Sequence, residues 1–117
     1  MPAHFEVELD VFSGMPNPTW VLTNIESDHF TKQLASLSRT SARELSGNLG
    51  YRGFIVQVKQ GANAQLIRIQ TGTVHISEGT TTVYAQDVDR ELERWLLNTG
   101  RSHLRKELFQ IAERELR

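Results

Sequence analysis

Apolar and polar residues alternate strictly at the start of the chain. The apolar members point to one side of an extended backbone, and they are Phe5, Val7, Leu9 and Val11. The polar members point to the other side, and they are His4, Glu6, Glu8 and Asp10. This period of two predicts a strand over residues 4–12 that covers a core with one face.

The next segment switches from strand to helix patterning. A short strand is expected over residues 19–22, after a loop rich in proline. Thr23 stands three residues before Glu26, which is the spacing of a capping box at the start of a helix. Apolar residues then recur at helical spacing, which predicts a helix over about residues 24–37.

Strand patterns return in the middle of the chain. Residues 38–53 are irregular, and residues 41–44 are expected to start one short helical turn. Four strands are then predicted, over residues 54–60, 65–70, 73–77 and 81–86. Because the breaks between them are short and contain glycine, hairpins are the expected connections and an antiparallel meander is the expected result.

The last thirty residues have the periodicity of two helices. Asp87 is the expected N-cap of the first, and Gly100 is expected to end it in a left-handed conformation. The predicted buried stripe of this helix consists of Val88, Leu92, Trp95 and Leu96. Ser102 is expected to cap the second helix, whose predicted stripe consists of Leu104, Leu108, Ile111, Ala112 and Leu116. The two helices are expected to form an αα-hairpin.

Together these elements predict a single α+β domain over residues 1–117. Strands cluster along the chain and do not alternate with helices, which is typical of this fold class. We expect an antiparallel sheet of about five strands, a helix after the first strand segment, and a C-terminal αα-hairpin packed on one face. An all-β barrel with appended helices is the alternative.

Composition narrows the function more by exclusion than by assignment. Among 117 residues, 13 Lys and Arg balance 14 Asp and Glu, so no uniform positive field favours nucleic-acid binding. Apolar runs are too short to predict a membrane span, and the chain has no cysteine for a disulfide, a thiolate metal site or a nucleophile. A soluble, cytoplasmic protein without cofactor is expected.

One set of side chains offers an enzymatic interpretation. His75 is predicted on the polar face of the sheet, where Glu6, Glu8 or Asp10 would form a His-carboxylate pair able to act as a general base. The competing interpretation is that His75 makes an ordinary cross-strand contact. The three carboxylates are not expected to bind a metal ion, because a straight strand spreads them apart.

The loop between the first two predicted strands is locally stiff. Pro16 and Pro18 each fix their own φ and push the preceding residues, Met15 and Asn17, towards extended conformations. A stiff loop loses little entropy on binding, so Met15, Pro16 and Asn17 are candidate ligand-binding residues. Trp20, directly after the loop, is expected to plug one end of the core.

Two further features suggest contact surfaces. Tyr51 and Arg52 stand between glycines before a predicted strand, and an aromatic ring beside a guanidinium is a combination enriched at binding surfaces. Alternatively, Tyr51 packs on the edge of the core. Phe109 widens the stripe of the last helix, which suggests a self-association contact and a homo-oligomer formed through the C-terminal helices.

The stretch VFSGMPNPTW, residues 11–20, resembles a segment of small bacterial proteins that carry no assigned activity. Those proteins often have a basic residue where this chain has Met15. In size and in its sheet-plus-helix layout, the chain is also similar to small peptide-binding accessory proteins of ribosomal-peptide natural-product biosynthesis. That similarity implies a peptide ligand, such as a precursor peptide.

The sequence is therefore consistent with three functions. The favoured one is a non-catalytic accessory module that binds a peptide or protein segment, by β-augmentation at a sheet edge. The alternative is a small enzyme that uses His75 with one of the three carboxylates. The third is an oligomer-forming protein that associates through Phe109.

Overall fold

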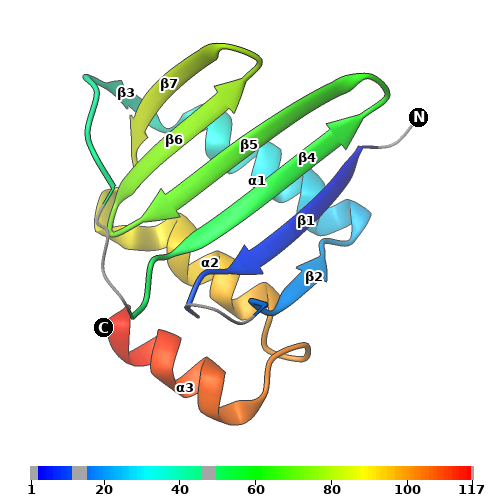
Figure 1. The fold of residues 1–117 in the computed structure, drawn as a ribbon, viewed down its shortest axis with the longest axis vertical. Coiled ribbons are helices and arrows are strands. Elements are labelled where there is room, and N and C mark those ends of the chain that lie inside the picture. The colour runs from blue at the N-terminus through cyan, green and yellow to red at the C-terminus, as the bar shows by residue number, and fades with distance from the viewer. Residues whose placement is uncertain (1–2, 12–15, 46–49, 117) are drawn as a thin grey trace.

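A computed structural model describes residues 3–11, 16–45 and 50–116 of the chain. Within these residues it is α+β, with three α-helices and one antiparallel sheet of seven strands in the order β2-β1-β4-β5-β6-β7-β3 (Figure 1). The strands are β1 His4–Leu9, β2 Thr19–Val21, β3 Ser38–Thr40, β4 Phe54–Gln60, β5 Asn63–Gln70, β6 Thr73–Glu78 and β7 Thr81–Gln86. The helices are α1 Asn24–Ser36, α2 Glu91–Thr99 and α3 Lys106–Glu115, and a 3₁₀ turn, η1 Val88–Arg90, precedes α2.

The expectation of about five strands was too low. The strand β3 lies where an irregular segment was expected, and the helical turn predicted for residues 41–44 does not form. Three residues are too few to show an alternating pattern, so β3 exists through its pairing with β7, far away in the sequence. The short strand β2 pairs with β1 and was expected.

The four central strands form the predicted meander. Each consecutive pair from β4 to β7 is antiparallel and joined by a two-residue turn. Thr71 and Gly72 have φ angles of 49° and 81°, the combination found in a type I′ turn. Gly61 and Gly79 take positive φ at the first position of their turns, as type II′ turns require.

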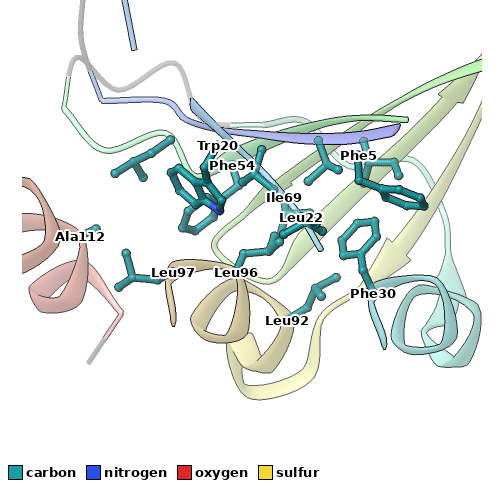
Figure 2. Packing of buried hydrophobic residues seen from close by; sticks show 14 of the residues in the cluster. Phe5, Trp20, Leu22, Phe30, Phe54, Ile69, Leu92, Leu96, Leu97 and Ala112 are labelled. Carbon is teal, nitrogen blue, oxygen red and sulfur yellow. The ribbon is translucent and has the colours of Figure 1, made fainter. Parts of the chain in front are cut away.

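One face of the sheet and the helices enclose the core. A cross-strand row in register supplies much of it, and its members are Leu9, Phe54, Ile69, Val74 and Ala85. The helices α1 and α2 lie on this side of the sheet and bury Phe30, Leu92 and Leu96 against it (Figure 2). None of the helices formed by the described residues lies on the opposite face of the sheet, which we call the open face (Figure 1).

Side chains that precede α1 and α2 accept hydrogen bonds from the first turns of these helices. Thr23 and Glu26 form the predicted capping box at the start of α1. The Asp87 carboxylate accepts from the amides of Leu92 and Glu93 at 2.8 and 3.0 Å, although Arg90, not Asp87, stands at the N-cap position of α2. The helix nevertheless starts later than expected, because left-handed residues in η1 interrupt the backbone. Val88, placed in the buried stripe by sequence, is therefore 60% exposed.

Trp20 occupies the core as predicted, and its ring explains why residue 100 is a glycine. Its ring packs edge-on against Phe54, and its Nε1 donates to Thr99 Oγ1 at 2.9 Å. Gly100 is not left-handed, since its φ is −90°. A Cβ at Gly100 would lie 2.5 Å from the Trp20 ring, so the glycine is needed for close packing.

The last helix differs most from expectation. Arg105, not Ser102, is the N-cap of α3. Leu104, Ala112 and Leu116 are buried as predicted, whereas Ile111 is 45% exposed and Phe109 is buried instead. Phe109 is 8% exposed, with the Arg101 guanidinium 4.3 Å from its ring centroid, so it does not project outwards as expected. In Figure 1, α3 lies beside α2 and beyond the end of the sheet, and the predicted αα-hairpin on one sheet face is not confirmed.

Candidate functional site

The proline loop is tied back to the first strand by Asn17. The Asn17 Nδ2 donates to Glu8 Oε2 at 2.8 Å and to Asp10 Oδ1 at 3.1 Å. Its Oδ1 accepts from the backbone amide of Val11 at 3.1 Å. The side chain therefore bridges β1 and the loop, while Pro16 is exposed beside it. Met15, the remaining candidate in this loop, lies outside the described residues.

Arg52 joins the same cluster from the segment before β4. Its Nη2 lies 2.8 Å from Asp10 Oδ1, and the backbone amide of Arg52 donates to the Asp10 carbonyl at 2.8 Å. The hydrogen bond to Asp10 raises the pKa of the Arg52 guanidinium above its ordinary value. Arg68 approaches the other carboxylate oxygen at 3.8 Å. The structure thus brings Asn17 and Arg52 together around Asp10, which is 6% exposed.

Tyr51 points the opposite way, into the core. Its ring is 8% exposed, packs edge-on against Phe54, and its hydroxyl donates to Glu93 Oε2. Glu93 is fully buried, and its carboxylate also accepts from Arg90 Nε and Nη2 at 3.1 and 3.0 Å. Burial, reinforced by the Glu93 carboxylate, raises the pKa of Tyr51 well above its ordinary range. This network fastens the start of α2 to the segment before β4.

His75 does not meet the carboxylates required by the enzymatic interpretation. His75 on β6 pairs with Arg68 on β5, Arg68 pairs with Ile55 on β4, and Ile55 pairs with Glu8 on β1. These four residues form one cross-strand row on the open face of the sheet. Three interstrand steps separate His75 from Glu8, or about 14 Å at the usual strand spacing. Instead, His75 packs edge-on against Tyr84, and its Nε2 contacts the backbone oxygen of Arg43.

The contact between His75 and Arg43 shapes one edge of the sheet. The strand β3 pairs with Tyr84, Ala85 and Gln86 only. Beyond that point the chain turns towards His75, which lies on the open face. Within the part of the chain that the structure describes, residues 81–83 of β7 therefore have a partner strand on the β6 side alone.

A pocket of about 380 Å³ lies beside this uncovered half of β7, lined by Arg39, Gln65, Ile76, Glu78, Thr81 and Val83. Every lining residue comes from a strand, and all belong to the face of the sheet that carries the helices further along. Val83 is 39% exposed and provides an apolar wall with Ile76. We call residues 81–83 with this pocket the β7 edge site.

The sequence did not reveal this site. The strand over residues 81–86 was predicted correctly. Whether its outer edge is open depends on which distant segment pairs with it, and the residues of the strand itself do not encode that. No local pattern in the sequence marks the three residues of β3, Ser38–Thr40, as the partners of β7. The predicted residues Met15, Pro16, Asn17, Tyr51 and Arg52 all belong to other parts of the chain.

Residues 3–11, 16–45 and 50–116 offer neither a metal-ligating cluster nor a membrane-spanning helix. These residues contain no group of three His, Asp or Glu side chains arranged to hold a metal ion. None of their helices is long and apolar enough to cross a membrane. No protein-family model matches the chain, and comparisons with curated proteins and with solved structures find no similar protein.

Proposed function

We propose that the protein is a non-catalytic binding module that captures an extended peptide or protein segment by adding it as a strand to β7. The observation that supports this proposal is the unequal pairing of β7. All six residues of β7 pair with β6, whereas β3 pairs with the last three. Strand addition needs such an exposed length of edge, together with pockets for alternate side chains.

The direction of the main-chain groups supports the same site. The Asp87 amide donates to the Gly72 carbonyl at 2.8 Å, so the neighbouring pair, Thr73 with Gln86, is a non-hydrogen-bonded pair. Amide and carbonyl groups alternate in direction along a strand. Those of Thr82, four residues before Gln86, therefore point away from β6, towards the open edge.

The class of ligand follows partly from the sequence. Its similarity to peptide-binding accessory proteins makes a precursor peptide of ribosomal-peptide biosynthesis the ligand to try first. The proline-loop residues Met15, Pro16 and Asn17, with Tyr51 and Arg52, remain predicted contact residues. Asn17 bonds to β1 and Arg52 precedes β4, and the strands β5 and β6 lie between β4 and β7, so a contact at these residues is a prediction separate from the β7 edge site.

Substituting Thr82 tests the proposal with a matched pair of variants. Thr82→Pro removes the one amide that strand addition needs, and proline is tolerated on an edge strand where the amide faces solvent. Thr82→Val keeps that amide, while both variants lose the hydroxyl contact with Ser77. Both variants are then applied to an array of immobilised octapeptides of random sequence.

We expect the wild type and Thr82→Val to bind the same set of peptides and Thr82→Pro to lose them, although all three proteins unfold at similar urea concentrations. Equal binding by Thr82→Pro and Thr82→Val would exclude β7 as the attachment point. An array on which the wild type enriches no peptide would refute peptide capture itself.

A further inference from the structure

We propose that the β7 edge site selects an antiparallel peptide strand with an aliphatic side chain opposite Val83 and a basic side chain two residues later, opposite Thr81. This inference rests on the proposed function and names the ligand class for the same site. It is carried by three features of the site, namely the strand direction, the apolar wall and the charge of Glu78.

The sheet favours one direction for the added peptide, and β3 limits how far the peptide extends along β7. Every pair in the sheet is antiparallel, and antiparallel hydrogen bonds are the more favourably aligned. Thr40 pairs with Tyr84, so the added peptide reaches no further along β7 than Val83. The first of its residues to face the pocket is therefore the one opposite Val83.

The pocket wall at this position is apolar. Ile76 pairs with Val83 across β6 and β7, so their side chains lie next to each other on the same face. Ile76 is 7% exposed, while 39% of Val83 remains open to solvent. An aliphatic side chain placed beside Val83 would cover that exposed surface, which is the favourable part of strand addition here.

Two residues further along the peptide, the row contains the carboxylate of the pocket, Glu78, whereas the guanidinium that lines the pocket, Arg39, lies in register with Ala85. Thr81 pairs with Glu78, so a side chain opposite Thr81 lies on the same face and in the same cross-strand row as Glu78, with Thr81 between them. The contact found for that carboxylate is a long one of 3.4 Å from Gln65 Nε2, and none of the ion pairs among the described residues involves it. A lysine or arginine at this peptide position would supply the missing opposite charge.

The experiment uses acetylated, amidated heptapeptides added to the whole ¹⁵N-labelled protein. In the first peptide, isoleucine and lysine stand two places apart among threonines. A second peptide has glutamate in place of lysine, and a third has serine in place of isoleucine. Each is titrated against the wild type and against Glu78→Lys, and the amide shifts of residues 81–84 are followed.

On the wild type, the lysine peptide should bind about threefold more tightly than the glutamate peptide, the size expected of an exposed ion pair. On Glu78→Lys the order should reverse, and the serine peptide should bind most weakly to both proteins. Equal affinity of the lysine and glutamate peptides, or an unchanged order on Glu78→Lys, would overturn the inference.

The outcomes separate this inference from the proposed function. If the lysine and glutamate peptides bind the wild type equally well and neither binds Thr82→Pro, the proposed strand addition is supported and only the proposed ligand class is refuted. Peptides that bind without moving the Thr82 and Val83 amides refute both.

Discussion

The tether formed by Asn17 gives the sharpest test of how the proline loop is held. Replacing Asn17 with alanine removes the amide hydrogen bonds to Glu8 and Asp10 and the acceptor for the Val11 amide. A hydrogen bond to a charged partner contributes about 1.5–3 kcal/mol and a neutral one about 0.5–1.5 kcal/mol when buried. Because Asn17 is only half-buried and water replaces part of what is lost, we expect a loss of about 2–4 kcal/mol.

That loss is measurable by thermal unfolding followed by circular dichroism. For a domain of this size it corresponds to a fall in Tm of about 10 °C. The near-isosteric Asn17→Asp is the more informative variant, because it keeps an acceptor for Val11 and replaces the donor with a charge facing two carboxylates. We expect Asn17→Asp to be at least as unstable as Asn17→Ala near neutral pH, and to regain stability when the carboxylates are protonated in acid.

The matched control is Gln110→Glu, the same exchange of amide for carboxylate at an exposed position of α3. It should change stability by less than about 0.5 kcal/mol. Wild-type stability in Asn17→Asp near neutral pH would refute the reasoning, because the donated hydrogen bonds would then contribute nothing.

Three further predictions concern packing and buried polar groups. Gly100→Ala should destabilise the fold by about 1–3 kcal/mol and alter tryptophan fluorescence, because the added Cβ meets Trp20; unchanged emission would contradict this. Tyr51→Phe removes the hydroxyl that donates to buried Glu93 and should cost about 1–3 kcal/mol in urea unfolding, so a neutral result would contradict the network. Burial raises the pKa of Asp87 above its ordinary 3.8, so the folded state binds a proton on this carboxyl more tightly than the unfolded state does. The stability that this proton contributes is lost as the pH rises from 3.8 through the pKa of the folded state. The stability of wild type minus that of Asp87→Asn should therefore be larger at about pH 3 than at about pH 7, and a difference that stays constant would refute the burial argument.

The parts of the fold that were predictable from sequence are those decided by neighbouring residues. The capping box of Thr23 and Glu26 spans one helical turn, and the two-residue turn at Thr71 and Gly72 closes a hairpin locally. Both lie where the pattern placed them. The strand β3 was missed because its partner is β7, 44 to 48 residues further along the chain, and no local pattern encodes that pairing.

Side-chain partners were harder to predict than elements. The sequence indicated a stiff proline loop but not that Asn17 would reach back to Glu8 and Asp10, although an asparagine between two prolines after an acidic strand was a visible signal. The contribution of Gly100 was misassigned because its neighbour, Trp20, is eighty residues away. Candidate sites depend on such distant partners, which is why the β7 edge site emerged only with the structure.

Hydrogen exchange at the Thr82 amide tests strand addition most directly. A peptide selected on the octapeptide array is added to the wild-type protein, and exchange is compared with and without it at residues 82 and 83. Because the Thr82 amide points to the open edge and that of Val83 points to β6, we expect peptide to protect Thr82 and to leave Val83 unchanged. Saturating peptide with no added protection at Thr82 would contradict the account.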